Sequence, residues 1–439
     1  MSALATTSGF RRDALETLLA TRSEPRWLTA RREAAWDRFA ALGMPDPQAE
    51  EWMRTDIRLF KLDRFGPALG GDAPAQRELP PPLLAAGVDL GGRVAALDGR
   101  TVVSELDARW AQRGVLLGDL SQLAAEHGDL LRTYLDRETV APGYDKFSAL
   151  GHAFWTSAAV LYVPPGVRVE QPIHLYSALG DGACDVSRTL IVLAEGAEAT
   201  VLSETASRGP HDAGLHVGSI ELLVEPGARL RYVNLQNWGD KVWHFAHQKA
   251  AVAARGGLQW TLGALGSRLA KVNQRVALTG PDAEAQVNGV LFTQGRQHLC
   301  YNTHQHHEAP HCRSDLLYKA ALQDESRTVW RGMIKVDPVA QRTDAYQRND
   351  NLLLSPTARA DSIPGLEIEA DDVRCTHGST SGRVDDEQLF YAMTRGYTRR
   401  EAVRMIVAGF FQQVFDRITI ESVRDALGEA IGSRVRDLQ

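Results

Sequence analysis

The feature of this sequence that most constrains its fold is a series of turns that recur at an almost constant interval. Gly166, Gly196, Gly227 and Gly257 each lie in a short turn, and the successive intervals are 30, 31 and 30 residues. Short β-rich runs such as AAVLYV, TLIVLA, SIELLV and LRYVNLQ lie between these turns. A steady period of this size, in which every unit reads strand–turn–strand, predicts a solenoid of stacked coils.

Two β architectures contain many short strands like those of this region. From about residue 155 to about residue 370, no amphipathic helix of about 12 residues or more separates the strands, which favours a parallel β-helix over solenoids that contain helices. A two-sheet sandwich also contains many short strands, but it has no need for so regular an interval. We therefore expect a mainly β fold whose core is a parallel β-helix.

The two ends of the chain have a helical pattern instead. The segment EPRWLTARREAAWDRFAALGMP has apolar residues at helical spacing, and Gly43 followed by Pro45 ends it. A second short helix is expected near Pro47, and residues 66–90, rich in Pro, Gly and Ala, are expected to form an irregular connection. The predicted domains are residues 1–90 (helical, with the connection), 91–384 (β-helix, with regular coils from about 155) and 385–439 (helical).

The predicted C-terminal helix carries a wide apolar stripe. Thr398 stands three residues before Glu401, the spacing of a capping box at a helix start. The stripe that follows has i, i+3, i+4, i+7 spacing and consists of Val403, Ile406, Val407, Phe410, Phe411, Val414 and Ile418. This stripe either packs against the end of the β-helix or forms a docking surface for another subunit, and both can hold for different parts of the helix.

Charge and cysteine content exclude several classes of protein. The formal net charge of −6 does not indicate a nucleic-acid or membrane binder. The N-terminal residues lack the apolar core of a signal peptide, and no run approaches the roughly 18 apolar residues of a membrane span. Four cysteines in 439 residues, with no CxxC pair, are no disulfide scaffold. We expect a cytoplasmic protein with reduced thiols.

One of these cysteines, Cys375, lies two residues before His377 in the segment DDVRCTHGSTSGRVDDEQLFY. Thiolate and imidazole are soft-metal ligands and also parts of nucleophilic sites. On a strand, two residues at this spacing point to the same face. The spacing leaves three readings open: a metal site, a catalytic pair, or a polar turn without chemistry.

A second candidate is the histidine-rich segment CYNTHQHHEAPHC, which runs from Cys300 to Cys312. If it is extended, His304 shares a face with His306, while His307 and His311 share the other face. Zinc sites normally draw their ligands from two elements, so one strand is an awkward source of four ligands. The open alternatives are a metal site using His304, His307 and His311, a polar ladder, or a surface that pairs with another subunit.

Several longer motifs together resemble a known family, the SufB/SufD proteins of the SUF system for iron–sulfur cluster assembly. HHEAPHCRSDLLYK resembles the family's DHxxPHxxSxxLYK, with His306 at the usual aspartate. EEWMRTDI is similar to its EEWRYTD motif, and residues 343–396 resemble its most characteristic block. The CTHG form at 375–378, and the lack of a cysteine before Cys184, resemble the SufD branch rather than the SufB branch, which has HEA at His377–Gly378–Ser379.

The resemblance implies a right-handed parallel β-helix between helical ends. It also implies a non-catalytic scaffold in a SufBCD complex, which pairs with SufB through the β-helices and builds a transient Fe–S cluster at that interface. His377 matches a histidine implicated in cluster assembly, and Cys375 matches a nearby cysteine; both are expected transient metal ligands. The C-terminal helices, with Ile406, Val407, Phe410 and Phe411, are expected to bind the ATPase SufC, which supplies ATP hydrolysis.

The cysteine count agrees with a shared rather than a self-contained cluster. Fe–S clusters need thiolates first, and this chain offers few, without a closely spaced quartet. We therefore expect no cluster tightly bound by this chain alone, and we expect that exposed β-helix edges also allow a homodimer in isolation. The alternatives are a stand-alone metal-binding protein and a β-helix enzyme acting on polysaccharides.

Overall fold

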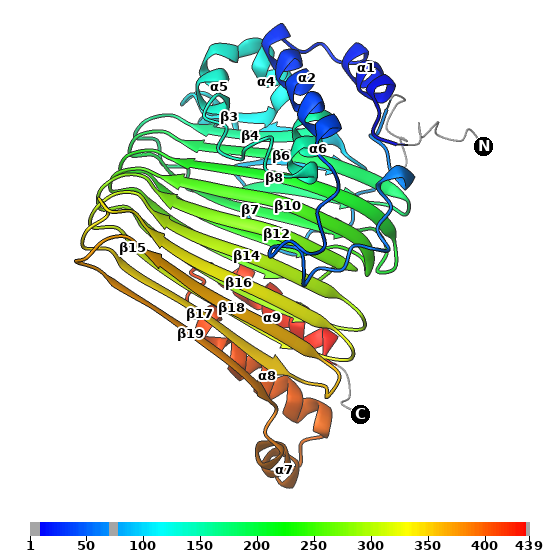
Figure 1. Ribbon diagram of the computed structural model, residues 1–439, viewed down its shortest axis with the longest axis vertical. Coiled ribbons are helices and arrows are strands. Elements are labelled where there is room, and N and C mark those ends of the chain that lie inside the picture. Colours follow the sequence, from blue (N-terminus) through cyan, green and yellow to red (C-terminus); the bar gives the residue numbers. More distant parts are fainter. Residues whose placement is uncertain (1–8, 70–77, 436–439) are drawn as a thin grey trace.

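The core of the protein is a parallel β-solenoid of eight coils, each built from two strands (Figure 1). The computed structural model describes residues 9–69 and 78–435. The strands of the coils are β4 (Ser157–Val163), β5 (Ile173–Leu179), β6 (Ala183–Leu193), β7 (Glu198–Ser207), β8 (Ala213–Val224), β9 (Arg229–Asn237), β10 (Lys241–Val252), β11 (Gly257–Ala264), β12 (Leu269–Leu278), β13 (Glu284–Thr293), β14 (His298–His307), β15 (Arg313–Leu322), β16 (Arg327–Val336), β17 (Asp344–Leu353), β18 (Arg359–Ile368) and β19 (Arg374–Arg383). The expectation of a mainly β solenoid with helical ends is confirmed.

Consecutive strands alternate between two sheets, so that each strand hydrogen-bonds to the strand one coil away. The sheet orders are β19-β17-β15-β13-β11-β9-β7-β5-β1-β2 and β18-β16-β14-β12-β10-β8-β6-β4-β3. Alternate residues point into the solenoid, where Tyr232, Trp260 and Leu316 belong to one continuous apolar cluster. Stacking therefore buries in each coil a face that one coil alone would leave in water.

The periodic turns are confirmed, with one shift in position. Gly166, Gly196 and Gly227 have positive φ values of 68°, 66° and 70°, which glycine adopts at little cost. In the fourth turn the left-handed residue is Arg255, with φ 56°, and Gly257 is the first residue of β11. The repeat in the sequence therefore predicts the stacked coils but not the residue that makes each turn.

The N-terminal end is covered by short strands and helices. These are α1 (Arg12–Ala20), α2 (Arg26–Ala41), the short 3₁₀ helix η1 (Leu62–Arg64), β1 (Gly92–Leu97), β2 (Arg100–Leu106), α3 (Ala108–Ala111), β3 (Leu116–Asp119), α4 (Leu120–Glu126), α5 (Gly128–Leu135) and α6 (Lys146–Phe154). The helix expected near Pro47 is wrong: residues 47–54 form turns, because this segment crosses the nine-stranded sheet and packs Trp52 against Phe147 and Phe245.

The C-terminal helices are α7 (Asp386–Thr394), α8 (Arg399–Phe415) and α9 (Glu421–Arg434). The capping box predicted for Thr398 and Glu401 is present at the start of α8. α8 packs on β13 and β15 of the ten-stranded sheet, whereas α7 projects beyond the last coil (Figure 1). Within the described ranges, none of the helices combines the length and apolar character that crossing a membrane requires. Parts of the predicted helical ends and connection, residues 1–8, 70–77 and 436–439, lie outside the described residues.

Candidate functional site

The last coil leaves the solenoid open at its C-terminal end. In the described part of the chain, β18 and β19 each pair with a neighbour on one side only, with β16 and β17 respectively. Both strands are 10 residues long, and most of their residues are exposed or half-buried, unlike those of the preceding coils. The free backbone N–H and C=O groups of such edges are templates for another strand.

Cys375 and His377 lie on this open coil and share a face, as their spacing predicts. In β19, Cys375 aligns with Ala345 of β17, and His377 aligns with Gln347. The column below His377 runs through inward-pointing residues of earlier coils, namely Gln347, Leu316, Val287 and Trp260. Both side chains therefore belong to the inner face of the solenoid and are reachable because no further coil covers them.

The Cys375 thiol sits at the edge of a small apolar cluster. The half-buried Cys375 packs against this cluster, which consists of Ile334, Val336, Ala340, Ala345 and Ala370. Burial raises the pKa of the Cys375 thiol above its ordinary value, and the nearby Asp344 carboxylate raises it further. The resting thiol therefore keeps its proton, and metal ligation through Cys375 would have to release that proton.

The surroundings of His377 are polar. Gln347 is fully buried beneath it, donating from Nε2 to the Gly365 carbonyl at 3.0 Å, and its Oε1 has no hydrogen-bond partner among the described residues. Ser379 donates its hydroxyl hydrogen to Ser362 at 2.7 Å, joining the two edge strands. A Cβ added at Gly378 would lie 3.4 Å from the Tyr346 hydroxyl, an ordinary contact, so packing within the chain does not require glycine there.

The histidine-rich segment forms β14 and its following turn, and its histidines point to different places. His307 is buried inside the solenoid, with Nε2 2.8 Å from Ser314 Oγ, whereas His304 lies on the outer face. His311 is in the turn, with φ 60°. Burial lowers the pKa of both His304 and His307 to about 4. The described residues contain no group of three or more His, Cys, Asp or Glu side chains arranged to hold a metal ion.

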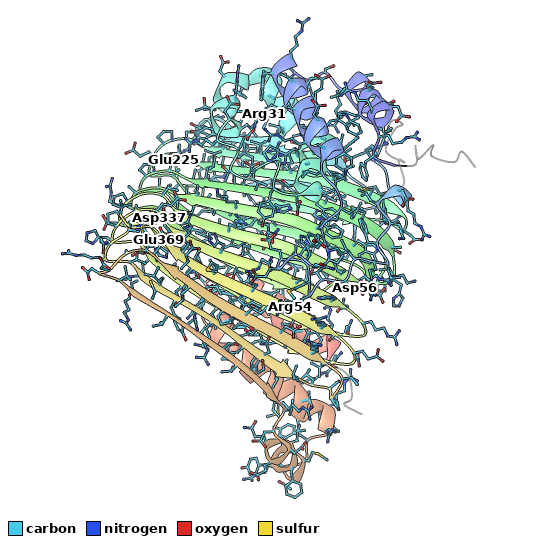
Figure 2. All side chains as sticks on the ribbon, in the orientation of Figure 1. Arg31, Arg54, Asp56, Glu225, Asp337 and Glu369 are labelled. Atoms are coloured by element: carbon cyan, nitrogen blue, oxygen red, sulfur yellow. The ribbon has the colours of Figure 1, made fainter. Side chains whose placement is uncertain are left out.

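His306, at the position where the aspartate was expected, lies between two carboxylates. Its Nδ1 is 3.0 Å from Glu308 Oε1 and its Nε2 is 2.9 Å from Asp337 Oδ1. Asp337 lies in the turn after β16, one coil before Glu369 (Figure 2). The hydrogen bond to the Glu308 carboxylate raises the pKa of His306 above its ordinary value, and the hydrogen bond to Asp337 raises it further. This histidine therefore bridges neighbouring turns.

The four residues predicted on α8 differ in their exposure. Val407 and Phe411 are buried against the ten-stranded sheet, while Ile406 and Phe410 are partly buried at the edge of the same cluster. The Phe410 carbonyl accepts a hydrogen bond from Lys319 Nζ at 3.0 Å. A partner could reach Val407 or Phe411 only by lifting α8 from the sheet, so these two residues hold the helix in place.

Sequence reasoning missed the apolar surface that the C-terminal helices do expose. Only Leu389 of α7 is buried, while the remaining large side chains point outward. The exposed set, named the α7 patch below, is Phe390, Tyr391, Met393, Tyr397 and Met405. The signal was in the sequence: large apolar residues at four of the five positions from 389 to 393 occupy more than one helix face, and a 9-residue helix on one neighbour cannot bury them all.

Together these features define a class of protein: a β-solenoid with one covered end, one open end and an exposed apolar patch. Comparison with protein families identifies the class. Residues 176–410 match the SUF system FeS cluster assembly SufBD core domain, and residues 94–175 match the SufBD protein N-terminal region. The chain belongs to the SufBD family of iron–sulfur cluster assembly proteins.

Curated relatives carry the same family name. An iron–sulfur cluster assembly SufBD family protein of Mycobacterium leprae is 34% identical over 296 residues, covering 65% of this chain and 74% of that protein. Relatives of the same description from Staphylococcus saprophyticus and Staphylococcus epidermidis are 28% and 27% identical over 334 residues, covering 76% of this chain and 71% of each relative.

Proposed function

We propose that this chain is a cytoplasmic, non-catalytic scaffold subunit of the SufD type, which pairs with SufB and builds an iron–sulfur cluster at their shared interface. The observation that carries the proposal is the position of Cys375 and His377 on the open last coil, beside two unpaired strand edges. A second solenoid that continues these edges would bring its own ligands to the same place.

The chemistry of the two residues suits a site completed by a partner. One thiol and one imidazole cannot fill the coordination of a cluster, which takes mostly thiolates. The thiol of Cys375 keeps its proton at rest, so this chain offers His377 first and Cys375 only when a metal displaces the proton. Weak, incomplete ligation also favours transfer of a finished cluster to another protein.

The docking of the ATPase SufC is the second part of the proposal. We assign it to the α7 patch and the exposed side of α8 rather than to Val407 and Phe411. Phe390 and Tyr391 are 71% and 59% exposed, on a helix that projects from the solenoid. Aromatic side chains held in water at this exposure are typical anchors of protein interfaces.

Co-expression of this chain with SufB and SufC tests the shared site. We expect the wild-type complex to show the absorbance of an assembled cluster and His377→Ala to lose most of it, while the subunits still copurify. His211→Ala is the matched control, because this exposed histidine lies in a distant turn and pairs with Asp240. A complex with His377→Ala that assembles clusters like the wild type would contradict the proposed role.

A parallel variant separates edge pairing from ligation. Replacing Leu366 of β18 by proline removes one N–H donor from the free edge without touching Cys375 or His377. The N–H groups of Arg359 and Glu369 point to β16, so those of the even-numbered residues between them point away from it. If the edges pair with SufB, this variant loses SufB from the pulled-down complex, whereas His377→Ala keeps it. Retention of SufB by the proline variant would show that the two solenoids meet elsewhere.

A further inference from the structure

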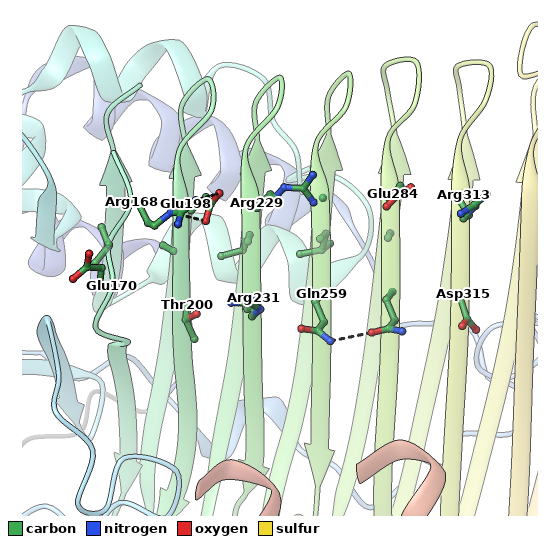
Figure 3. A pocket seen from close by; sticks show the side chains of 17 residues that line it. Arg168, Glu170, Glu198, Thr200, Arg229, Arg231, Gln259, Glu284, Arg313 and Asp315 are labelled. Atoms are coloured by element: carbon green, nitrogen blue, oxygen red, sulfur yellow. Dashed lines mark hydrogen bonds and ion pairs between the residues drawn. The ribbon is translucent and has the colours of Figure 1, made fainter. Parts of the chain in front are cut away.

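Charged side chains on the outer faces of the solenoid are balanced by neighbours of opposite sign. In the groove of ≈ 620 Å³ that crosses the outer face of the ten-stranded sheet, Arg168 pairs with Glu198 at 2.9 Å (Figure 3). In the same groove, Arg313 stands in register between Glu284 and Asp344. Opposite charges on neighbouring strands stabilise each other, so this groove offers little free charge to a partner.

The start of α8 departs from this balance. Four arginines, named the arginine cluster below, lie between the end of α7 and the second turn of α8: Arg395, Arg399, Arg400 and Arg404. The first three are exposed and the fourth is half-buried. None of the four forms an ion pair with a carboxylate of the described residues. This end of the molecule therefore carries positive charge that the described chain does not neutralise.

The positions of these arginines are unfavourable for α8 itself. Arg399 and Arg400 are its first two residues, where the partial positive charge of a helix N-terminus repels cations. Arg404 lies four residues after Arg400, so two like charges meet on one side of the helix. The carboxylate of the first turn, Glu401, accepts a hydrogen bond from the Thr398 N–H at 2.7 Å in the capping box. An arrangement that local stability disfavours points to a use outside the chain.

Two of the guanidinium groups are held in place without being neutralised. Arg395 Nη2 donates to the Tyr391 hydroxyl at 2.9 Å, and its Cζ lies 5.2 Å from the centre of the Tyr391 ring. Tyr391 belongs to the α7 patch, so the cluster adjoins that patch. Arg400 Nε donates to the Val435 carbonyl at 3.3 Å, at the end of α9. Neither partner is a carboxylate, and a side chain that is already fixed loses less conformational entropy on binding.

We propose that the arginine cluster recognises an acidic surface of the partner that covers the α7 patch. Resting on the docking of SufC proposed above, the assignment predicts that the SufC surface facing the cluster carries Asp and Glu side chains. The planar guanidinium group forms paired hydrogen bonds with a carboxylate, which gives the contact its specificity. The apolar patch supplies most of the affinity, whereas the cluster raises the rate of encounter, because opposite charges attract each other before contact.

Stopped-flow mixing of the full chain with SufC separates these two contributions. Arg395→Gln/Arg399→Gln should slow association about fivefold at ~20 mM salt, and its rate should approach that of the wild type at ~500 mM salt, where surface charges are screened. The matched control, Arg255→Gln/Arg342→Gln, changes the net charge equally. Its arginines lie in turns before β11 and β17, at the opposite ends of the strands from α7, so association should stay within about twofold of the wild type.

Arg399→Glu is a second test, because structural and binding roles predict different results. A carboxylate suits the first turn of a helix, so the urea midpoint of unfolding should not fall below that of the wild type. Association with SufC at ~20 mM salt should nevertheless slow, because the variant places a negative charge against an acidic surface. A lower midpoint with an unchanged association rate would make Arg399 a structural residue and overturn the proposal.

The remaining outcomes distinguish the cluster from the docking on which it rests. Equal slowing in the control, or association that does not depend on salt, overturns the charge assignment but leaves the docking of SufC intact. Absence of SufC binding by the wild type at every salt concentration contradicts the docking and the charge assignment together. Binding of the wild type to phosphatidylserine vesicles, lost in Arg395→Gln/Arg399→Gln, would assign the cluster to an anionic membrane and overturn the proposal.

Discussion

The α7 patch offers the sharpest quantitative prediction, because its leading residue is an exposed phenylalanine on a projecting helix. Complete burial of a phenylalanine side chain contributes up to about 3 kcal/mol. Phe390 is 71% exposed in the free chain, so a partner that covers it fully gains about 2 kcal/mol from this residue. Phe390→Ala should therefore weaken the binding of SufC about 30-fold.

The measurement is titration calorimetry of the purified chain with SufC. Leu59→Ala is the matched control, because Leu59 is 69% exposed but lies in the N-terminal segment, far from α7 in the sequence. Its affinity for SufC should equal that of the wild type. Circular dichroism should show both variants folded, since neither side chain is buried in the free chain. An affinity of Phe390→Ala within about threefold of the Leu59→Ala value would refute the assignment of SufC docking to the α7 patch.

Three further predictions concern stability, each followed by urea unfolding of the full chain. Glu204 is buried and accepts hydrogen bonds from the backbone N–H groups of residues 83–85, so Glu204→Gln should lower the free energy of unfolding by about 2–4 kcal/mol. The half-buried Glu198 only pairs with the exposed Arg168, so Glu198→Gln should lower it by less than about 1 kcal/mol. The pKa of His306 is raised in the folded state, so the protonated imidazole stabilises the fold fully at pH values below its ordinary pKa of 6.5. This stabilisation is lost as the pH rises through the folded-state pKa. His306→Ala should therefore destabilise the chain more at pH ~5.5 than at pH ~8.5. Gly289→Ala should cost about 1–3 kcal/mol, because its Cβ would lie 2.6 Å from the buried Tyr318 ring.

The sequence predicted the solenoid because the rule that builds it is local and repeated. Each coil must reverse direction twice. In three of these turns a glycine, Gly166, Gly196 or Gly227, supplies the left-handed residue, and this makes the repeat visible in the sequence. The rule is a preference, however, and later turns use Arg255 and Asp282 at the same conformation. A repeat read from glycine alone therefore predicts the architecture better than it predicts the individual turns.

The candidate site was predictable only in part. The two-residue spacing of Cys375 and His377 was enough to predict a shared face, since strands have a period of two. That this face points into an open solenoid depends on β19 being the last strand, which only the stacking of all coils reveals. Likewise the apolar stripe on α8 predicted a buried face, but whether the sheet or a partner covers Phe411 depends on where α8 packs.

The open coil has a further consequence for how many molecules can join. The chain presents free, in-register strand edges at one end, while β2, the four-residue strand β3 and the N-terminal helices occupy the other end. A subunit with such edges at both ends could add copies without limit and grow a fibre, as an unclosed head-to-tail contact does. A subunit with such edges at one end is monovalent: when two of them pair through these ends, neither end is left for a third. If the open coil is the pairing surface, as proposed above, the same geometry that offers a template for assembly also limits that assembly to a pair.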